Sequence, residues 1–71
     1  MKKKYALAKL AGYMKKHRDR KGISRDELAK MAKVNYNTII KLESGANKNP
    51  TVKTLIALAQ VFGTGVEDLI S

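Results

Sequence analysis

The sequence predicts an all-α fold, a compact bundle of five short helices. Apolar residues recur at three- and four-residue intervals, and no segment alternates apolar and polar residues as a half-exposed strand does. Residues that favour helix starts precede these periodic segments, and glycines, which favour helix ends, follow them. The chain has 71 residues, a length that suits one domain and buries only about 60% of its unfolded surface. We therefore expect a single domain over residues 1–71.

The first helix is expected over residues 4–21, with Gly22 at its end. Its inward stripe consists of Leu7, Leu10, Ala11, Met14 and Arg18. Arg18 is the cation on this apolar stripe, and a partly buried arginine needs an acidic partner; an exposed arginine that touches phosphate is the alternative. The cations away from this stripe, which either are solvated or contact phosphates or an anionic lipid surface, are Lys9, Lys15, Lys16 and Arg20.

Residues 24–45 predict two helices joined by a tight turn, and the rest of the domain serves this segment. Ser24 and Glu27 have the spacing of a capping box. Asn35 is placed to cap the second helix, and Gly45 is placed to end it. The residues expected to face inward are Leu28, Ala29, Met31, Ala32, Ile39 and Leu42.

The outer face of the second helix is unusual for a solvated surface, which is normally charged and long-chained. It combines an aromatic ring, an amide, an apolar side chain, a cation and a hydroxyl, from Tyr36, Asn37, Ile40, Lys41 and Ser44. These residue types contact base edges and thymine methyl groups in the major groove of DNA. We therefore predict four base-reading residues: Tyr36, Asn37, Ile40 and Lys41.

Phosphate contacts are predicted where side chains lie beside exposed helix-start amides or in the loop after the second helix. The residues are Arg25, Asn35, Asn47, Lys48 and Asn49. Tyr36 has a second interpretation, because its hydroxyl suits phosphate as well as a base. Ile40 has one too, because packing against a neighbouring side chain would also explain it.

Residues 24–45 resemble the helix-turn-helix of phage repressor and Cro-like regulators, the XRE type. The similarity is carried by Leu28-Ala29, Val34, Ile39, Leu42 and the Glu43-x-Gly45 motif. It implies a lambda repressor-like fold, with the second helix of the motif in the major groove and the first crossing the backbone. It also implies that Arg18 pairs with Glu43. Lys33 departs from the family, which often has glycine there; a left-handed lysine costs roughly 1 kcal/mol more than glycine.

The last two helices are expected over residues 51–62 and from Thr64 to Ile70. Asn49 or Thr51 can cap the first of them, Gly63 breaks it, and Thr64 with Glu67 resembles another cap. Residues 51–62 are apolar on nearly all sides, and the face predicted to point inward is Val52, Leu55, Ile56, Ala59 and Phe62.

Ala57 and Val61 lie roughly opposite that inward face, where an isolated small domain would carry polar groups. We predict that they form a homodimer interface. The alternative is that Val61 simply covers the fifth helix.

The charge of the chain is polarised. Its net charge is +9, and all 15 lysines and arginines lie at or before Lys53, whereas residues 54–71 carry two acids, Glu67 and Asp68. Such a distribution favours a basic half that meets a polyanion. Lys2, Lys3 and Lys4 are either a frayed terminus or an arm along DNA (residues 1–4), as some relatives have.

The residue inventory argues against an enzyme. The sequence has no cysteine, one histidine and no Gly-rich phosphate loop, so neither a metal nor another cofactor is expected. No segment has 18 consecutive apolar residues, and we expect a cytoplasmic protein that binds no membrane and no small molecule.

The predicted function is a sequence-specific double-stranded DNA-binding regulator, which the resemblance implies is a repressor or autoregulator. A weak dimer would bind two half-sites of a palindromic operator. Two alternatives remain open. One is an antitoxin whose main partner is a toxin protein; the other is a basic amphipathic peptide that acts on membranes.

Overall fold

The structure is a computed structural model that describes residues 9–47 and 49–70. Five helices make up this part of the chain, and no strand occurs within it. They are α1 (Leu10–Lys21), α2 (Arg25–Ala32), α3 (Tyr36–Ser44), α4 (Val52–Phe62) and α5 (Val66–Ile70). The predicted all-α bundle is confirmed. The first helix was predicted to begin at residue 4, and residues 4–8 of that prediction lie outside the described residues.

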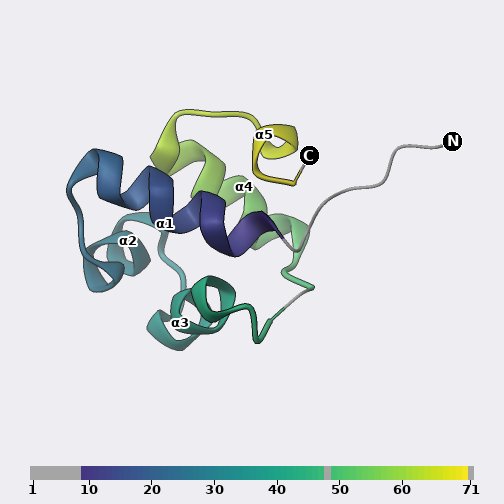
Figure 1. The fold of residues 1–71 in the computed structure, drawn as a ribbon, viewed down its shortest axis with the longest axis horizontal. Coiled ribbons are helices and arrows are strands. Elements are labelled where there is room, and N and C mark those ends of the chain that lie inside the picture. Colours follow the sequence, from purple (N-terminus) through teal and green to yellow (C-terminus); the bar gives the residue numbers. More distant parts are fainter. Residues whose placement is uncertain (1–8, 48, 71) are drawn as a thin grey trace, which may run out of the picture.

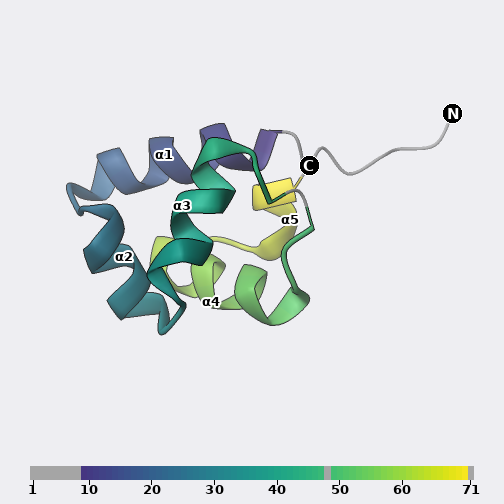
Figure 2. The same cartoon turned by 90° about the horizontal axis from the view of Figure 1, so that it is seen from below.

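Helix α1 is central to the arrangement of the other helices. It packs against α3 on one side and against α4 and α5 on another, as Figures 1 and 2 show. Helix α2 packs against both α3 and α4 and so closes one end of the bundle. Every helix contributes to the core, which consists of Leu10, Met14, Leu28, Ala29, Ala32, Ile39, Leu42, Leu55, Leu58, Ala59 and Leu69.

The capping residues lie largely where the sequence places them. The Ser24 hydroxyl accepts the Glu27 amide at 3.0 Å, and the Glu27 carboxylate accepts the Ser24 amide at 2.7 Å. Together these two bonds form the predicted capping box of α2. Thr51, not Asn49, caps α4, because its hydroxyl accepts the Thr54 amide at 3.1 Å.

The predicted inward faces of α2 and α4 are confirmed only in part: Leu28, Ala29, Ala32, Leu55 and Ala59 are buried, but three other predicted residues are exposed. Met31 of α2 is 52% exposed, and Val52 and Ile56 of α4 are 68% and 44% exposed, whereas Leu58 is fully buried. The prediction for α4 is wrong at Val52 and Ile56 because the helix is apolar on nearly every side, so its sequence leaves its rotation loosely determined. Its neighbours α1, α2 and α5 fix that rotation instead, and they cover Leu55, Leu58 and Ala59.

The turn between α2 and α3 is closed by Lys33 in a left-handed conformation, with φ 58° and ψ 44°. It is the only residue other than glycine with positive φ in the described part of the chain. The amide of Val34 donates to the carbonyl of Ala29 at 2.9 Å, which completes the helix end. The lysine therefore holds a backbone conformation that is strained for a residue with a Cβ atom.

We expect Lys33→Gly to stabilise the domain by about 0.5–1 kcal/mol, because relief of the left-handed strain outweighs the extra freedom of glycine in the unfolded chain. Thermal unfolding would show a rise in Tm of about 2–8 °C for a domain of this size. Lys30→Gly is the control, since the same change inside α2 should cost about 1 kcal/mol. A fall in Tm for Lys33→Gly would contradict the assigned strain.

Candidate nucleic-acid interface

Helix α3 is fixed to the bundle by its inner face and by both of its ends. Ile39 and Leu42 are buried to 0% and 1% exposure in the core. At the start of the helix the Asn35 side-chain oxygen accepts the Asn37 amide at 2.8 Å. Gly45 ends the helix in a left-handed conformation with φ 84°, which glycine adopts without strain. The predicted core positions and caps of this helix are confirmed.

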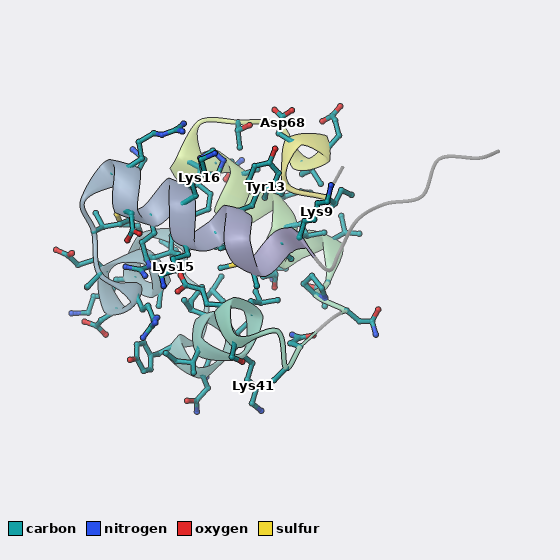
Figure 3. All side chains as sticks on the ribbon, in the orientation of Figure 1. Lys9, Tyr13, Lys15, Lys16, Lys41 and Asp68 are labelled. Atoms are coloured by element: carbon teal, nitrogen blue, oxygen red, sulfur yellow. The ribbon has the colours of Figure 1, made fainter. Side chains whose placement is uncertain are left out.

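The outer face of α3 is open to solvent. Tyr36 is 46% exposed, Asn37 and Lys41 are exposed, and Ile40 is half-buried. Figure 3 shows the Lys41 side chain projecting from α3 on the side away from α1. The Ser44 hydroxyl donates to the Lys41 carbonyl at 3.1 Å and accepts the Ala46 amide at 3.2 Å, so it contributes to the helix end.

A single carboxylate ties α3 to both preceding helices. Glu43 is only 4% exposed at its side chain. Its Oε2 accepts the Nε of Arg18 at 2.8 Å, and its Oε1 accepts an Nη of Arg18 at 3.2 Å and the Nε of Arg25 at 3.0 Å. The pairing of Arg18 with Glu43 is therefore present, in the two-pronged geometry that arginine and carboxylate favour.

The remaining donor of Arg18 extends this network into the loop between α1 and α2. Its other Nη donates to the Ile23 carbonyl at 3.0 Å. The Arg18 side chain is 12% exposed, so both charges of the main pair are largely out of water. In the described part of the chain, no buried side-chain nitrogen or oxygen lacks a hydrogen-bond partner.

The charges of this network reinforce one another. Burial opposes ionisation of Glu43, but hydrogen bonds from Arg18 and Arg25 outweigh it and hold the pKa of Glu43 below its ordinary value. The hydrogen bond to Glu43 likewise raises the pKa of Arg18. Both groups are therefore ionised at neutral pH.

The bond from Arg25 to Glu43 was missed by the sequence analysis, which assigned Arg25 to phosphate. The only signal for this bond in the sequence was that the Glu43 carboxylate can accept hydrogen bonds from more than one donor. The Arg25 side chain is 46% exposed, so it lies at the rim of the ion-pair network rather than inside it.

Two of the other predicted phosphate contacts, Asn35 and Asn47, have local side-chain roles in this structure. The Asn35 oxygen caps α3, and the Asn47 oxygen accepts the Asn49 amide at 2.9 Å, which orders the loop after α3. The Asn49 side chain is exposed. Lys48 and the basic residues 1–4 lie outside the described residues. The described residues contain no cluster of three potential metal ligands.

These features define a helix-turn-helix DNA-binding domain, in which α3 presents an exposed face and α2 supports it. The family model described as "Helix-turn-helix" matches residues 14–69, most of the chain. The chain thus belongs to the helix-turn-helix family of XRE-type, Cro/C1-like regulators. No curated protein sequence matches it.

Solved structures agree with this assignment. The N-terminal DNA-binding domain of SinR from Bacillus subtilis matches with a TM-score of 0.85 and 27% identity, covering 87% of this chain and 90% of that one. SinR in complex with DNA matches with a TM-score of 0.81 and 28% identity, over 84% and 95% of the two chains.

A third match supports the fold alone. The restriction-modification controller protein C.AhdI from Aeromonas hydrophila has a TM-score of 0.80 at 22% identity, over 89% and 94% of the chains. The family is one of DNA-binding transcriptional regulators, and the similarity to the SinR structures agrees with that class. No helix of residues 9–47 and 49–70 has the length and hydrophobicity needed to cross a bilayer.

We expect Arg18 and Glu43 to behave as a coupled pair in stability measurements. Glu43→Ala should cost about 3 kcal/mol, because it leaves a largely buried guanidinium without its carboxylate. Arg18→Ala should cost less, since Arg25 still faces the carboxylate. The double variant should lose less than the two single variants together, as measured by urea unfolding.

Arg25→Ala serves as the control for this cycle. Because the Arg25 side chain is exposed, its removal should lower the free energy of unfolding by well under half as much as removal of Glu43. Additive losses for Arg18 and Glu43 would show that the pair does not stabilise the domain. Loss of DNA affinity by Arg18→Ala without loss of stability would assign Arg18 to phosphate binding.

Proposed function

We propose that this regulator binds a specific double-stranded operator by placing α3 in the major groove, with α2 crossing the backbone. The observation that carries the proposal is the exposed outer face of α3 on a helix held at both ends, at its core and at Glu43. An α-helix fits the major groove, and a rigid mounting lets its side chains meet base edges in one register. SinR, which has been solved with DNA at 28% identity to this chain, supports the proposal.

Within this face we assign different roles to different side chains. Asn37 suits a two-bond contact with adenine, and Lys41 suits donation to guanine. Ile40 suits a thymine methyl group, and Tyr36 a base or a phosphate. Phosphate contacts are proposed for the start of α2, the start of α3 and the loop after α3, through Arg25, Asn35, Asn47, Lys48 and Asn49.

We further propose that the regulator is a repressor or autoregulator that binds a palindromic operator as a weak homodimer. A two-fold dimer would set two copies of α3 about 34 Å apart, which is one turn of duplex. The proposed interface includes Ala57 and Val61, because residues 54–71 contain no lysine or arginine that would repel a second copy.

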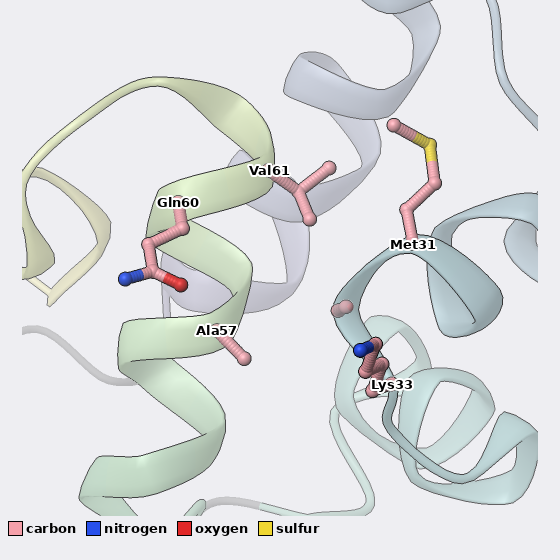
Figure 4. A pocket seen from close by; sticks show the side chains of 6 residues that line it. Met31, Lys33, Ala57, Gln60 and Val61 are labelled. Carbon is pink, nitrogen blue, oxygen red and sulfur yellow. The ribbon is translucent and has the colours of Figure 1, made fainter.

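The surroundings of these two residues support that choice. They line a hollow of about 380 Å³ between α4 and α2, together with Met31, Lys33 and Gln60. Figure 4 shows Val61 and Met31 facing each other across it from the two helices. Since Met31 is 52% exposed, the apolar surface extends beyond α4. An interface on so small a domain would be weak alone and strengthened by simultaneous binding of two half-sites.

Asn37→Ala should weaken binding to the selected operator by about 1–3 kcal/mol and relax preference at one base pair. The operator would first be obtained by selection from a random duplex pool, and affinities measured by fluorescence anisotropy at fixed salt. The matched control is Asn49→Ala, the same substitution at a proposed phosphate contact, which should weaken operator and random duplexes alike. Equal losses on both duplexes for Asn37→Ala would overturn the base-reading assignment.

Val61→Glu should abolish cooperative binding to a two-half-site duplex while single half-site affinity stays within about twofold. Ala57→Glu is a second variant. Because half-buried Ala57 and Val61 both pack on the core, thermal unfolding of each variant separates loss of the interface from loss of stability. The control is Ile56→Glu, an exposed apolar position on another edge of α4. Cooperativity that survives both test variants but is lost in the control would place the interface elsewhere on α4.

A further inference from the structure

Helix α1 carries a row of cations on the side of the domain away from α3. Lys9, Lys16 and Arg20 are exposed and follow helical spacing, with half-buried Tyr13 between the first two. We refer to Lys9, Tyr13, Lys16 and Arg20 as the α1 stripe. Its cations lie outside the core, because the core face of the same helix is made by Leu10 and Met14.

The direction of the α1 stripe follows from Arg18. An α-helix turns by about 100° per residue, so Lys16 and Arg20 lie about 160° around the axis from Arg18, on either side, and Lys9 about 180°. Arg18 points to Glu43 of α3 at 2.8 Å. The α1 stripe therefore points away from α3. Figure 3 agrees: Lys9 and Lys16 lie on the α5 side of α1, whereas Lys41 projects from α3 on the far side.

The neighbours of the α1 stripe give the same direction independently. Three of its residues line a hollow of about 290 Å³ with His17 and with Thr64 and Asp68 of the α4–α5 region. His17 is stacked on Phe62 of α4, with ring centroids 5.1 Å apart. A duplex held against the outer face of α3 is separated from this surface by α3 and by α1, each about 10–12 Å in diameter.

We propose that the α1 stripe is a second duplex-binding surface, independent of sequence, by which the regulator bridges two DNA segments. The inference rests on the proposed function in that α3 binds the first duplex. The three cations span about 16 Å along α1, and duplex DNA offers one negative charge per about 1.7 Å of axis. The first duplex also keeps distant parts of the same DNA at high local concentration, which favours a weak second contact.

A lipid surface fits the α1 stripe less well than a duplex does. A helix that lies on a membrane buries its apolar face in lipid. The apolar face of α1 is already covered by the core. What remains exposed is a charged row without large aliphatic side chains, and such a row binds phosphates mainly through release of counterions.

One acidic group opposes the proposed contact and provides a sensitive test of it. The Asp68 carboxylate accepts the Thr64 hydroxyl at 2.6 Å and the Gly65 amide at 3.3 Å. The hydrogen bond from Thr64, and to a lesser extent the one from Gly65, holds the pKa of Asp68 below its ordinary value. The Asp68 carboxylate beside the hollow is therefore ionised. Asp68→Asn keeps an oxygen for both bonds and removes the repulsion of phosphate.

The experiment immobilises the selected operator duplex, loads it with the full chain, removes unbound protein and measures capture of a labelled duplex of unrelated sequence. The test variant is Lys16→Ala with Arg20→Ala. The matched control is Lys21→Ala with Lys30→Ala, two exposed cations on other faces, so both variants remove two charges from a chain of net charge +9. Loading on the operator is quantified separately for each variant.

We expect all variants to load equally on the operator. Relative to the unchanged chain, the test variant should capture about tenfold less labelled duplex, and the control variant should stay within about twofold. Asp68→Asn should raise capture about twofold. Equal capture of the labelled duplex by the test and control variants, at equal loading, would overturn the proposed role of the α1 stripe. A dimer that places one α3 on each duplex would give that result, because it does not use the α1 stripe. Binding of anionic phosphatidylglycerol vesicles without capture of duplex would also overturn it. Failure of loading itself would instead reject the proposed function.

Discussion

The position of α3 depends on the Glu43 carboxylate, which is shared by two arginines from the two preceding helices. A carboxylate that is 4% exposed would be costly alone, but three hydrogen bonds from Arg18 and Arg25 satisfy it. Arginine suits this role because its planar donors meet both carboxylate oxygens at once. The result joins α1, α2 and α3 near the C-terminal end of α3, while Asn35 caps its start. In a domain with so small a core, a polar network is an economical way to fix one helix direction.

Much of this arrangement was predictable because its signals are local. Capping residues and terminal glycines act over three or four residues, so the capping box at Ser24 and the helix end at Gly45 were found correctly. The left-handed Lys33 was anticipated as a consequence of the family resemblance. The pairing of Arg18 with Glu43, 25 residues apart, also came from the resemblance; spacing alone indicated only that Arg18 needed a partner.

The features that were missed depend on contacts between helices. Helix α4 is apolar almost all round, so its rotation is set by what packs on it. Ile56, which was expected inward, is exposed, and Leu58, for which the sequence predicted no position, is buried. Met31 has the correct periodicity for burial but lies at the edge of the α2–α4 contact, where no helix covers it. Arg25 could be assigned to Glu43 only once α2 and α3 were placed together. The outer face of α3 was predicted as a set of side chains, whereas the DNA contacts of each remain proposals.

The polarised charge of the chain acquires a different meaning once the fold is known. In the sequence, the cations form one basic half; in space, α1 separates those near α3 from those on the α1 stripe. Charges on opposite sides of a helix cannot all serve one straight duplex, because a rigid rod contacts one side of a small domain. Either the far cations only keep the protein soluble and raise its rate of encounter with DNA, or they meet a second polyanion. The row of three cations along one line, beside a hollow that Asp68 lines, favours the second explanation, because cations that serve solubility alone need no alignment.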